Sequence, residues 1–469
     1  MLSANLPSFD LVQGFGRAVT AESRRVTVLR RMIWLYFALL ITEGVLRKWM
    51  IPSLAAPLLV IRDPLVLLIY VQAVRCRRFP VSGPMVAYFL LLSSFVLLAL
   101  FQMIAGIGGG PMVAAYGLRT NFLHLPLIFV IPQVLSYADV TRLGGWILRL
   151  SVPMTGLMIW QFLSGPDSWI NATAAGGGQQ IGSAMGKIRP AGTFSFITGA
   201  AHFFVLATAF LIYGLAQRRA PYSSWLLGAA LLSCIVVQPV SGSRTLVLGC
   251  ALIAVAAIVF AALSWGRAYR ILAVAALICA AFAALSLTGF FREAVTVFMA
   301  RWNNASGAST TDTLSMRILD GFLEPFAVMS QAGWFGKGIG LGTNGGSVLM
   351  TGAAQFLLAE GEWARVVLEA GPLLGFSFLA YRVCVAGDMG LRAMIGARHK
   401  NLLAWLLAWD ACLSLVNEQL SQPTNLGFMV LISGLCLAAM PAGRSEVTSE
   451  QTTRNGLLHS KLRFESQSP

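Results

Sequence analysis

The sequence predicts an all-α, polytopic membrane protein, and its composition carries that prediction. Of the 469 residues, 57% are hydrophobic and only 11% are charged, whereas an average soluble protein has about 45–50% apolar and about 25% charged residues. The mean hydropathy is +0.73. A chain this apolar cannot hide its nonpolar side chains in one soluble core, so an ordinary cytosolic or secreted domain is excluded.

Apolar runs long enough to cross a bilayer, which need about 20 residues, recur along the chain. By that criterion we expect about twelve transmembrane helices. Several runs are short or contain proline or glycine, which neighbouring helices in a bundle tolerate. The approximate centres of the runs are Ala38, Leu67, Ser94, Phe129, Met154, Val205, Ala230, Ile253, Ala276, Gly375, Ala408 and Leu431.

These runs divide the chain into five predicted parts. The parts are a basic N-terminal segment (1–31), a bundle of nine spans (32–289), a long outer loop (290–363), three further spans (364–440) and a polar tail (441–469). The tail is rich in Ser, Thr and Gln, so we expect it to be disordered. The loop contains an amphipathic stretch and a Gly-rich turn region, and a loop this long in a compact protein is usually functional.

The distribution of charged residues indicates how the chain is oriented in the membrane. The chain carries 34 Lys and Arg against 19 Asp and Glu, a formal net charge of +15. Such a charge can indicate nucleic-acid binding, but in a membrane protein short cytoplasmic loops are enriched in Lys and Arg. Basic clusters within 24–31, 75–78 and 382–400 fall in alternate loops, on the side of both termini. Both termini are therefore predicted to be cytoplasmic, and the N-terminal segment lacks the pattern of a cleavable signal peptide.

A smaller set of basic residues lies at the predicted outer ends of spans and in the outer loops, against this orientation rule. Ionisable residues at the membrane boundary indicate a functional site by default, and arginine binds phosphate oxygens in a bidentate manner without losing its charge. Several such arginines converging on one outer cavity would suit a pyrophosphate. The set comprises Arg47, Lys48, Arg62, Arg119, Lys187, Arg189, Arg244, Arg317 and Arg365.

Three members of this set have a simpler explanation. Arg47, Lys48 and Arg62 could snorkel to the interface or pair with a nearby acid, because Glu43 and Asp63 lie close in the sequence.

Arg244 and Arg317 are stronger candidates for binding a ligand. Small or apolar residues surround them, and no acid adjoins Arg244. We therefore expect these two arginines to be central to the site.

A second constellation opens the span that follows the long loop. At helical spacing, Glu362, Arg365 and Glu369 could share one face of that helix near the outer boundary. A carboxylate there, Glu360 or Glu362, could take a proton from an attacking sugar hydroxyl. The alternative is a structural network of the two glutamates with Arg365.

Other polar motifs favour structural roles. The seven cysteines and four histidines show no zinc-binding spacing, so no metal is predicted. The segment 336–342 is glycine-rich but lacks the ending of a phosphate-binding P-loop, which favours a turn. His124 and His202 lie in apolar spans and are expected in the core. Asp410 and Glu418, in or beside a late span, are expected to pair with a partner in the bundle.

The order of these motifs resembles the O-antigen ligase and polymerase superfamily of bacterial envelope glycan assembly, over most of the chain from Arg31 onward. The family elements are a Ser-x-Ser-Arg turn before a span, an outer-loop arginine followed by a Gly-rich segment, and a span that opens with an acid and a glycine. Here these elements read Ser241-Gly-Ser-Arg244, Arg317, Gly336-Lys-Gly338-Ile-Gly340 and Glu369-Ala-Gly371, with Arg189-Pro-Ala-Gly-Thr-Phe194 as a further family-like stretch.

One departure from the family bears on the mechanism. Many members carry His-Asn shortly before the acid-and-glycine motif, and that histidine is the favoured catalytic base. This sequence has Glu360-Gly-Glu362-Trp there, and its long loop contains no histidine. Either Glu360 or Glu362 replaces the base, or the assignment of a base fails for this protein. The change favours a polysaccharide polymerase over a lipid A-core ligase.

The resemblance implies a GT-C-like glycosyltransferase of the bacterial inner membrane that needs no metal or other cofactor. It would polymerise oligosaccharide repeat units carried on undecaprenyl pyrophosphate at the periplasmic face, with lipid-linked glycans as donor and acceptor. Arg244 and Arg317 would be catalytic and hold the pyrophosphate. The remaining predicted site residues are Arg119, Arg189 and Arg365 for the pyrophosphate, with Arg47, Lys48, Arg62 and Glu369 in support.

The other partners implied are membrane lipids and further polysaccharide assembly and export proteins, with no nucleic acid. A ligase that transfers finished glycan to a lipid or protein acceptor is the nearest alternative. A secondary transporter or a flippase for lipid-linked glycan belongs to another class, and it predicts polar residues at the membrane midplane rather than at one face.

Overall fold

The computed structural model describes residues 8–174, 182–217, 220–263, 268–306, 314–352, 356–398 and 400–440. In this part of the chain the regular elements are helices, apart from an isolated antiparallel bridge between Gly182 and Ile188. The all-α prediction is therefore confirmed for the described residues. The predicted tail, 441–469, lies outside them.

The first half of the chain forms twelve helices among the described residues. They are α1 (Ser8–Val45), η1 (Leu46–Met50), η2 (Pro52–Leu54), η3 (Pro57–Val60), α2 (Arg62–Arg75), α3 (Gly83–Ile104), α4 (Pro111–Leu118), η4 (Arg119–Leu123), α5 (Leu127–Val134), α6 (Tyr137–Leu163), η5 (Trp169–Asn171) and α7 (Ile197–Ala216). The second half contains α8 (Ser224–Val240), α9 (Arg244–Leu263), α10 (Ala268–Leu285), α11 (Gly289–Ser306), α12 (Leu314–Ala332), α13 (Asn344–Thr351), α14 (Glu362–Arg398), α15 (Leu402–Asn417) and α16 (Pro423–Ala439).

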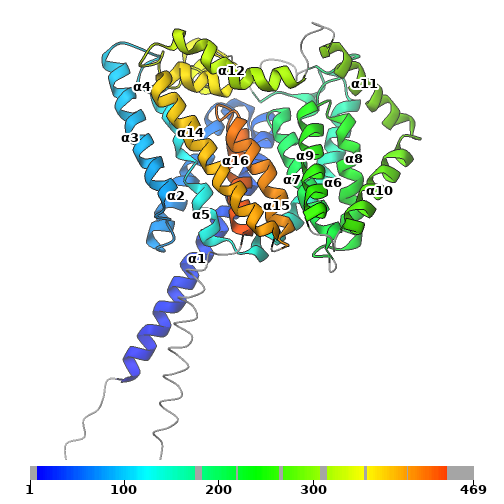
Figure 1. The fold of residues 1–469 in the computed structure, drawn as a ribbon, viewed down its shortest axis with the longest axis horizontal. Coiled ribbons are helices and arrows are strands. Elements are labelled where there is room, and N and C mark those ends of the chain that lie inside the picture. Colours follow the sequence, from blue (N-terminus) through cyan, green and yellow to red (C-terminus); the bar gives the residue numbers. More distant parts are fainter. Residues whose placement is uncertain are drawn as a thin grey trace, which may run out of the picture.

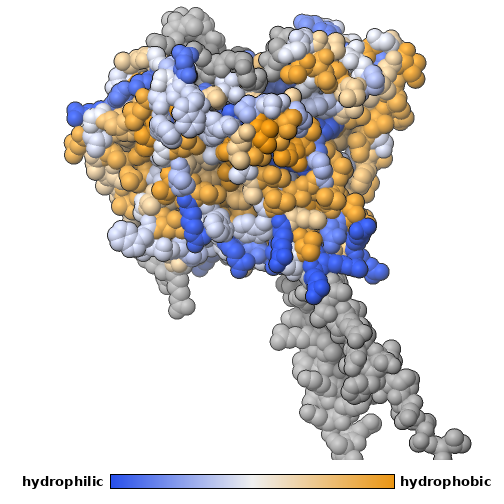
Figure 2. Space-filling view, turned by 180° about the vertical axis from the view of Figure 1, so that it is seen from behind, coloured by the Kyte–Doolittle hydropathy of each residue, from blue (hydrophilic) through white to orange (hydrophobic). Residues whose placement is uncertain are grey.

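Seven helical segments among the described residues are long and apolar enough to cross a membrane, and the pair α10–α11, bent by 103°, would make an eighth if it counts as one span. The shorter helices α8, α15 and α16 are also apolar. The protein is therefore a multi-pass membrane protein. Figure 2 shows an apolar band across the middle of the visible face, with hydrophilic side chains along its lower edge.

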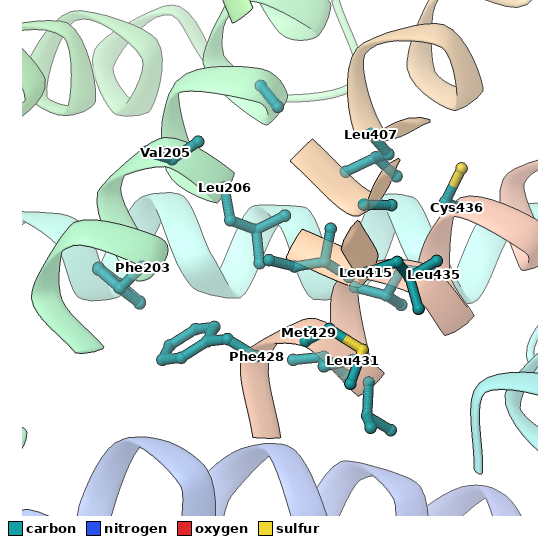
Figure 3. Close-up of a cluster of buried hydrophobic side chains, with 14 of the residues drawn as sticks. Phe203, Val205, Leu206, Leu407, Leu415, Phe428, Met429, Leu431, Leu435 and Cys436 are labelled. Atoms are coloured by element: carbon teal, nitrogen blue, oxygen red, sulfur yellow. The ribbon is translucent and has the colours of Figure 1, made fainter. Parts of the chain in front are cut away.

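The centre of the bundle is formed by α7, α15 and α16, whose apolar side chains interdigitate (Figure 3). Phe203, Leu206, Leu407, Phe428 and Leu431 are all essentially inaccessible to solvent. Helix α7 also packs along α9 and α6. Burying these side chains on several neighbouring helices fixes the relative positions of the helix ends, which is where the charged residues lie.

The two ends of the bundle differ. Helices α11, α12 and α13 gather at one end, which we call the loop face, and α1 projects from the opposite end, the terminal face (Figure 1). At the terminal face Asn401 Nδ2 donates to the carbonyl oxygen of Ala439, 2.7 Å away, which ties the α14–α15 turn to the end of α16. The segment 290–363 that the sequence assigns to a long loop thus contains three helices.

Candidate functional site

Two of the predicted loop-face cations share one buried acid. Glu43 lies at the end of α1, with one carboxylate oxygen 3.4 Å from Arg47 Nη1 and the other 3.1 Å from Arg62 Nε. The Arg62 guanidinium also donates to the hydroxyl group of Tyr36 at 3.3 Å. This confirms the simpler interpretation, pairing with a nearby acid, for both arginines.

Arg119 is likewise neutralised. Its Nε and Nη2 atoms lie 2.7 and 2.8 Å from the two carboxylate oxygens of Asp63, a bidentate pair. The buried ring of His124 contacts the same carboxylate at 3.0 Å, which gives this predicted core histidine a specific polar partner. The planar guanidinium group of Arg119 is therefore already bound to a carboxylate of its own chain.

Among the described residues no acid pairs with Lys48, whose side chain is held by the backbone. Its Nζ atom donates to the carbonyl oxygen of Gly192 at 2.6 Å and lies 4.3 Å from the ring centroid of Trp49. Burial lowers the pKa of Lys48 to about 7. Gln161 donates its amide to the same carbonyl oxygen, so both side chains fix the segment that precedes α7.

The glutamates at the start of α14 form a closed network. Arg365 donates to both carboxylate oxygens of Glu362, each at 2.9 Å, and to Glu369 at 2.9 Å. Its remaining bond goes to the side-chain oxygen of Asn121. All these charged side chains are at most 2% exposed. The geometry is that of the structural network, and we leave Arg365 and Glu369 out of the ligand site.

Arg382 corrects one placement made from the sequence. The sequence assigns it to a basic loop at the cytoplasmic end, but α14 continues to Arg398, so Arg382 lies inside a long helix. Its side chain is 1% exposed and donates to Glu362 at 2.9 Å and to the carbonyl oxygen of Leu415 at 2.7 Å. The backbone of α14 is kinked at Gly371, between Glu362 and Arg382. Helical periodicity in the sequence therefore does not predict the contact between these two residues.

Three other arginines meet at the loop face, with no acid between them in the part of the chain that the structure describes. Arg189 comes from the segment before α7, Arg244 is the first residue of α9, and Arg301 lies in the last turns of α11. Arg244 Nη2 donates to the carbonyl oxygens of Trp302 at 2.9 Å and of Arg301 at 3.4 Å. Arg301 Nη1 donates to the carbonyl oxygen of Gly182 at 3.3 Å. We call Arg189, Arg244 and Arg301 the arginine triad.

The partly buried triad differs in its pairing from the clusters around Glu43, Asp63 and Glu362. In the described part of the chain none of its members forms an ion pair, and each keeps a buried Nε atom without a hydrogen-bond partner. Nearby Lys187 is paired, 3.0 Å from Glu293. Burial together with the Arg301 charge lowers the pKa of Arg189 to about 10, so the side chain stays charged at neutral pH.

This electrostatic situation favours an anion. Partly buried like charges repel each other and lose part of their hydration, and both costs are offset when an anion binds between them. The planar guanidinium groups offer free N–H donors in the geometry that phosphate oxygens prefer. The ring of Trp302, with its centroid 5.0 Å from the Arg244 guanidinium carbon, holds Arg244 in place from one side.

The turn before α9 allows the triad to assemble. Gly242 has a φ of +58°, in the left-handed region that favours glycine, and a Cβ atom there would lie 2.8 Å from Ser183 Oγ and 3.3 Å from Arg189 Cγ. The family-like turn Ser241-Gly-Ser-Arg244 therefore needs glycine for both its conformation and its contact with Arg189.

Replacing Gly242 with alanine should lower the stability of the protein by roughly 1–2 kcal/mol, because alanine is strained at this backbone conformation. It should also displace Arg189 and reduce activity. Thermal unfolding in detergent measures the first effect. Gly228→Ala in α8 is the matched control, since a Cβ atom there meets nothing within 4 Å. A Gly242→Ala protein as stable as this control would contradict the expectation.

The other predicted site residues lie at different places. Arg317 is in α12, and its side chain lies outside the described residues. Glu360 is exposed just before α14, and its carbonyl oxygen accepts from Gln419 Nε2 at 2.7 Å. Glu362 is enclosed by Arg365 and Arg382, so Glu360 is the more accessible carboxylate of the two.

The glycine-rich segment 336–342 makes turns, as the sequence favours. Gly336, Gly338 and Gly340 all have positive φ values. A Cβ atom at Gly336 would overlap the backbone of Glu369, so this segment packs directly on the start of α14.

Sequence reasoning missed Arg301, although a signal existed. Arg301 lies in the predicted outer loop, so the orientation argument that singles out Arg317 applies equally to it. What the sequence could not show is that α11 folds back at an angle of 103° to α10 and brings Arg301 to the start of α9.

The arrangement as a whole can bind a multiply charged anion at one face of a membrane protein. Among the described residues, no group of three or more His, Cys, Asp and Glu side chains is placed to hold a metal ion. Comparison of the sequence with protein-family models gives no match, and no curated protein matches it either.

Proposed function

We propose that the protein is a membrane glycosyltransferase that polymerises oligosaccharide repeat units carried on undecaprenyl pyrophosphate. The observation that carries this proposal is the arginine triad, three partly buried cations that form no ion pair within the described residues, on the loop face of an apolar helical bundle. A pyrophosphate linked to a lipid tail combines the two properties that such a site selects, a dense negative charge and an apolar chain.

The proposal includes a topology of about twelve spans. Besides the seven segments that are long and apolar enough, the bent pair α10–α11 and the helices α1, α8, α15 and α16 would complete the set. The two termini would then lie in the cytoplasm of a bacterial inner membrane, and the loop face in the periplasm. Arg142, which is 66% exposed at the start of α6, and the exposed Arg392 support this orientation.

In the proposed reaction an acceptor hydroxyl attacks the anomeric carbon of the donor sugar, and the bond from that carbon to the pyrophosphate oxygen breaks. The triad, joined by Arg317, would stabilise the negative charge that develops on the departing lipid pyrophosphate. Glu360 would take the proton of the acceptor hydroxyl, since its carboxylate is exposed whereas that of Glu362 is enclosed by arginines. The arginines supply the positive charge that a metal ion provides in other enzymes.

The polymerase and its alternatives predict different products in a deletion strain. Loss of the polymerase should abolish long glycan chains and leave single repeat units on the lipid carrier. Accumulation of long lipid-linked chains would instead identify a ligase. Transport of lipid-linked glycan across proteoliposomes, without chain extension, would identify a flippase. Electrophoresis and mass spectrometry of the lipid-linked fraction distinguish the first two, and a strain complemented with wild-type protein is the control.

A further inference from the structure

A set of uncharged polar side chains with one carboxylate lies at the loop-face ends of the three central helices. Thr198 is in the first turn of α7, Glu418 follows α15, Gln419 and Gln422 lie in the connection to α16, and Asn425 is in the first turn of α16. We call these five residues the amide belt. All except Asn425 are partly exposed.

The belt is a continuous chain of hydrogen bonds. Thr198 Oγ1 donates to Asn425 Oδ1 at 2.7 Å, and Asn425 Nδ2 donates to Glu418 Oε1 at 2.6 Å. Gln422 Nε2 donates to Gln419 Oε1 at 2.6 Å, while its own oxygen lies 3.4 Å from Thr198 Oγ1. These contacts fix the side chains in defined rotamers, so their remaining donors and acceptors are pre-organised.

Buried residues on neighbouring helices hold Glu418 in place. His202, one turn further along α7, has its Nε2 atom 3.1 Å from Glu418 Oε2, and its ring stacks on Phe428 with centroids 5.7 Å apart. The backbone carbonyl oxygen of Glu418 accepts from Arg382 at 2.8 Å. The carboxylate is therefore oriented by His202 and Asn425, and the backbone of Glu418 by Arg382, while the side chain remains 19% exposed.

The chemistry of the belt suits the hydroxyl groups of a sugar. Each carboxamide offers both donors and acceptors, and a carboxylate accepts several hydrogen bonds, which is the combination that neighbouring hydroxyl groups need. None of the five belt residues is basic, so the belt does not attract a phosphate. The half-buried indole of Trp363 adjoins it, because its Nε1 atom donates to the carbonyl oxygen of Val416, two residues before Glu418.

The amide belt lies next to both predicted parts of the reaction centre, Glu360 and the arginine triad. Gln419 Nε2 donates to the carbonyl oxygen of Glu360, as described above. On the other side, α7 and α9 touch where a Cβ atom on Gly249 would overlap Val205. Counted from that contact at 1.5 Å per residue, Arg244 lies about 7.5 Å and His202 about 4.5 Å toward the loop face. The triad and the belt are thus at similar depth on neighbouring helices.

We infer that the amide belt is the subsite for the acceptor glycan, where it binds sugar hydroxyl groups beside Glu360. This inference rests on the proposed function for the word acceptor, but binding of a sugar chain can be measured without the donor lipid and without any transfer.

The experiment measures binding of labelled oligosaccharides to the full-length protein in nanodiscs, with no lipid donor present. The probes are neutral hexose, hexosamine and hexuronate oligosaccharides, and intrinsic tryptophan fluorescence is an independent readout. Wild-type protein should bind at least one probe saturably. Gln419→Ala combined with Gln422→Ala should weaken that binding by about tenfold or more, since several hydrogen bonds are lost. Gln72→Ala is the matched control, a partly buried amide in α2, and should bind as the wild type does.

Each outcome bears on the inference. Absence of saturable binding to any probe would overturn it, as would binding that the double variant retains unchanged. Gln422→Asn, which keeps the amide, should retain more affinity than the double variant and shows that the loss is not unfolding. Binding without chain extension would leave the sugar subsite standing while the proposed polymerase failed. Transfer with unaltered acceptor binding in the double variant would show the reverse.

Discussion

Replacing Arg244 with alanine should reduce the rate of glycan transfer by about 100-fold or more, which is the usual effect of removing one preorganised donor to a developing negative charge. Arg244 is the member of the triad fixed most firmly, by Trp302 and by two backbone carbonyl groups. Without it, the departing pyrophosphate would lose both a charge and two N–H donors. The measurement is the initial rate of chain extension from a purified lipid-linked repeat unit.

The control variants separate this effect from a general loss of positive charge. Arg142→Ala removes an exposed arginine whose nearest acid oxygen is 3.5 Å away, and it should leave the rate unchanged. Arg189→Ala and Arg301→Ala should each lower the rate, but less than additively with Arg244→Ala, because the three act on one anion. Arg244→Lys should recover only part, since lysine lacks the planar fork. Full activity of Arg244→Ala would refute the pyrophosphate assignment.

The sequence predicts the class of this protein well because that class depends on totals and periodic runs. Hydropathy alone identifies a multi-pass membrane protein, and the helices follow from it. The pairing of Arg47 with Glu43 can also be predicted, since residues four apart on a helix meet and Glu43 precedes Arg47 by that interval. Contacts that depend on such local rules can be predicted from the sequence.

The site depends on contacts that no local rule supplies. Whether an outward arginine is free or neutralised is decided by an acid from another helix, as with Arg119 and Asp63, which lie 56 residues apart. Arg365 shares with Arg244 a predicted place at the outer end of a span, but Glu362 and Glu369 on its own helix, together with Asn121, bind its donors. The triad can be identified only after these pairings exclude the other arginines from the ligand site. Arg301 enters it through the fold of α11, and His202 meets Glu418 across 216 residues.

Replacing Glu362 with glutamine should destabilise the protein strongly, by about 3–5 kcal/mol, because it leaves two buried arginines short of a counter-charge. Glu362 neutralises part of Arg365 and is the acid bound to Arg382, and all three side chains are at most 2% exposed. We expect a large drop in the unfolding temperature in detergent and poor recovery of monodisperse protein. The matched control is Asp388→Asn, whose pair with Arg392 is about half exposed and is worth less than about 1 kcal/mol.

This variant also decides between the two roles considered for Glu362. A structural counter-ion predicts that the loss of activity follows the loss of folded protein, and that Arg382→Met added to Glu362→Gln restores part of the stability, since one unpaired charge is then gone. A catalytic base predicts the opposite: Glu362→Gln would unfold at the wild-type temperature while transfer fell steeply. That result would assign the role of base to Glu362 instead of Glu360. A Glu360→Gln protein that is folded but inactive would support Glu360, the more accessible carboxylate, as the base.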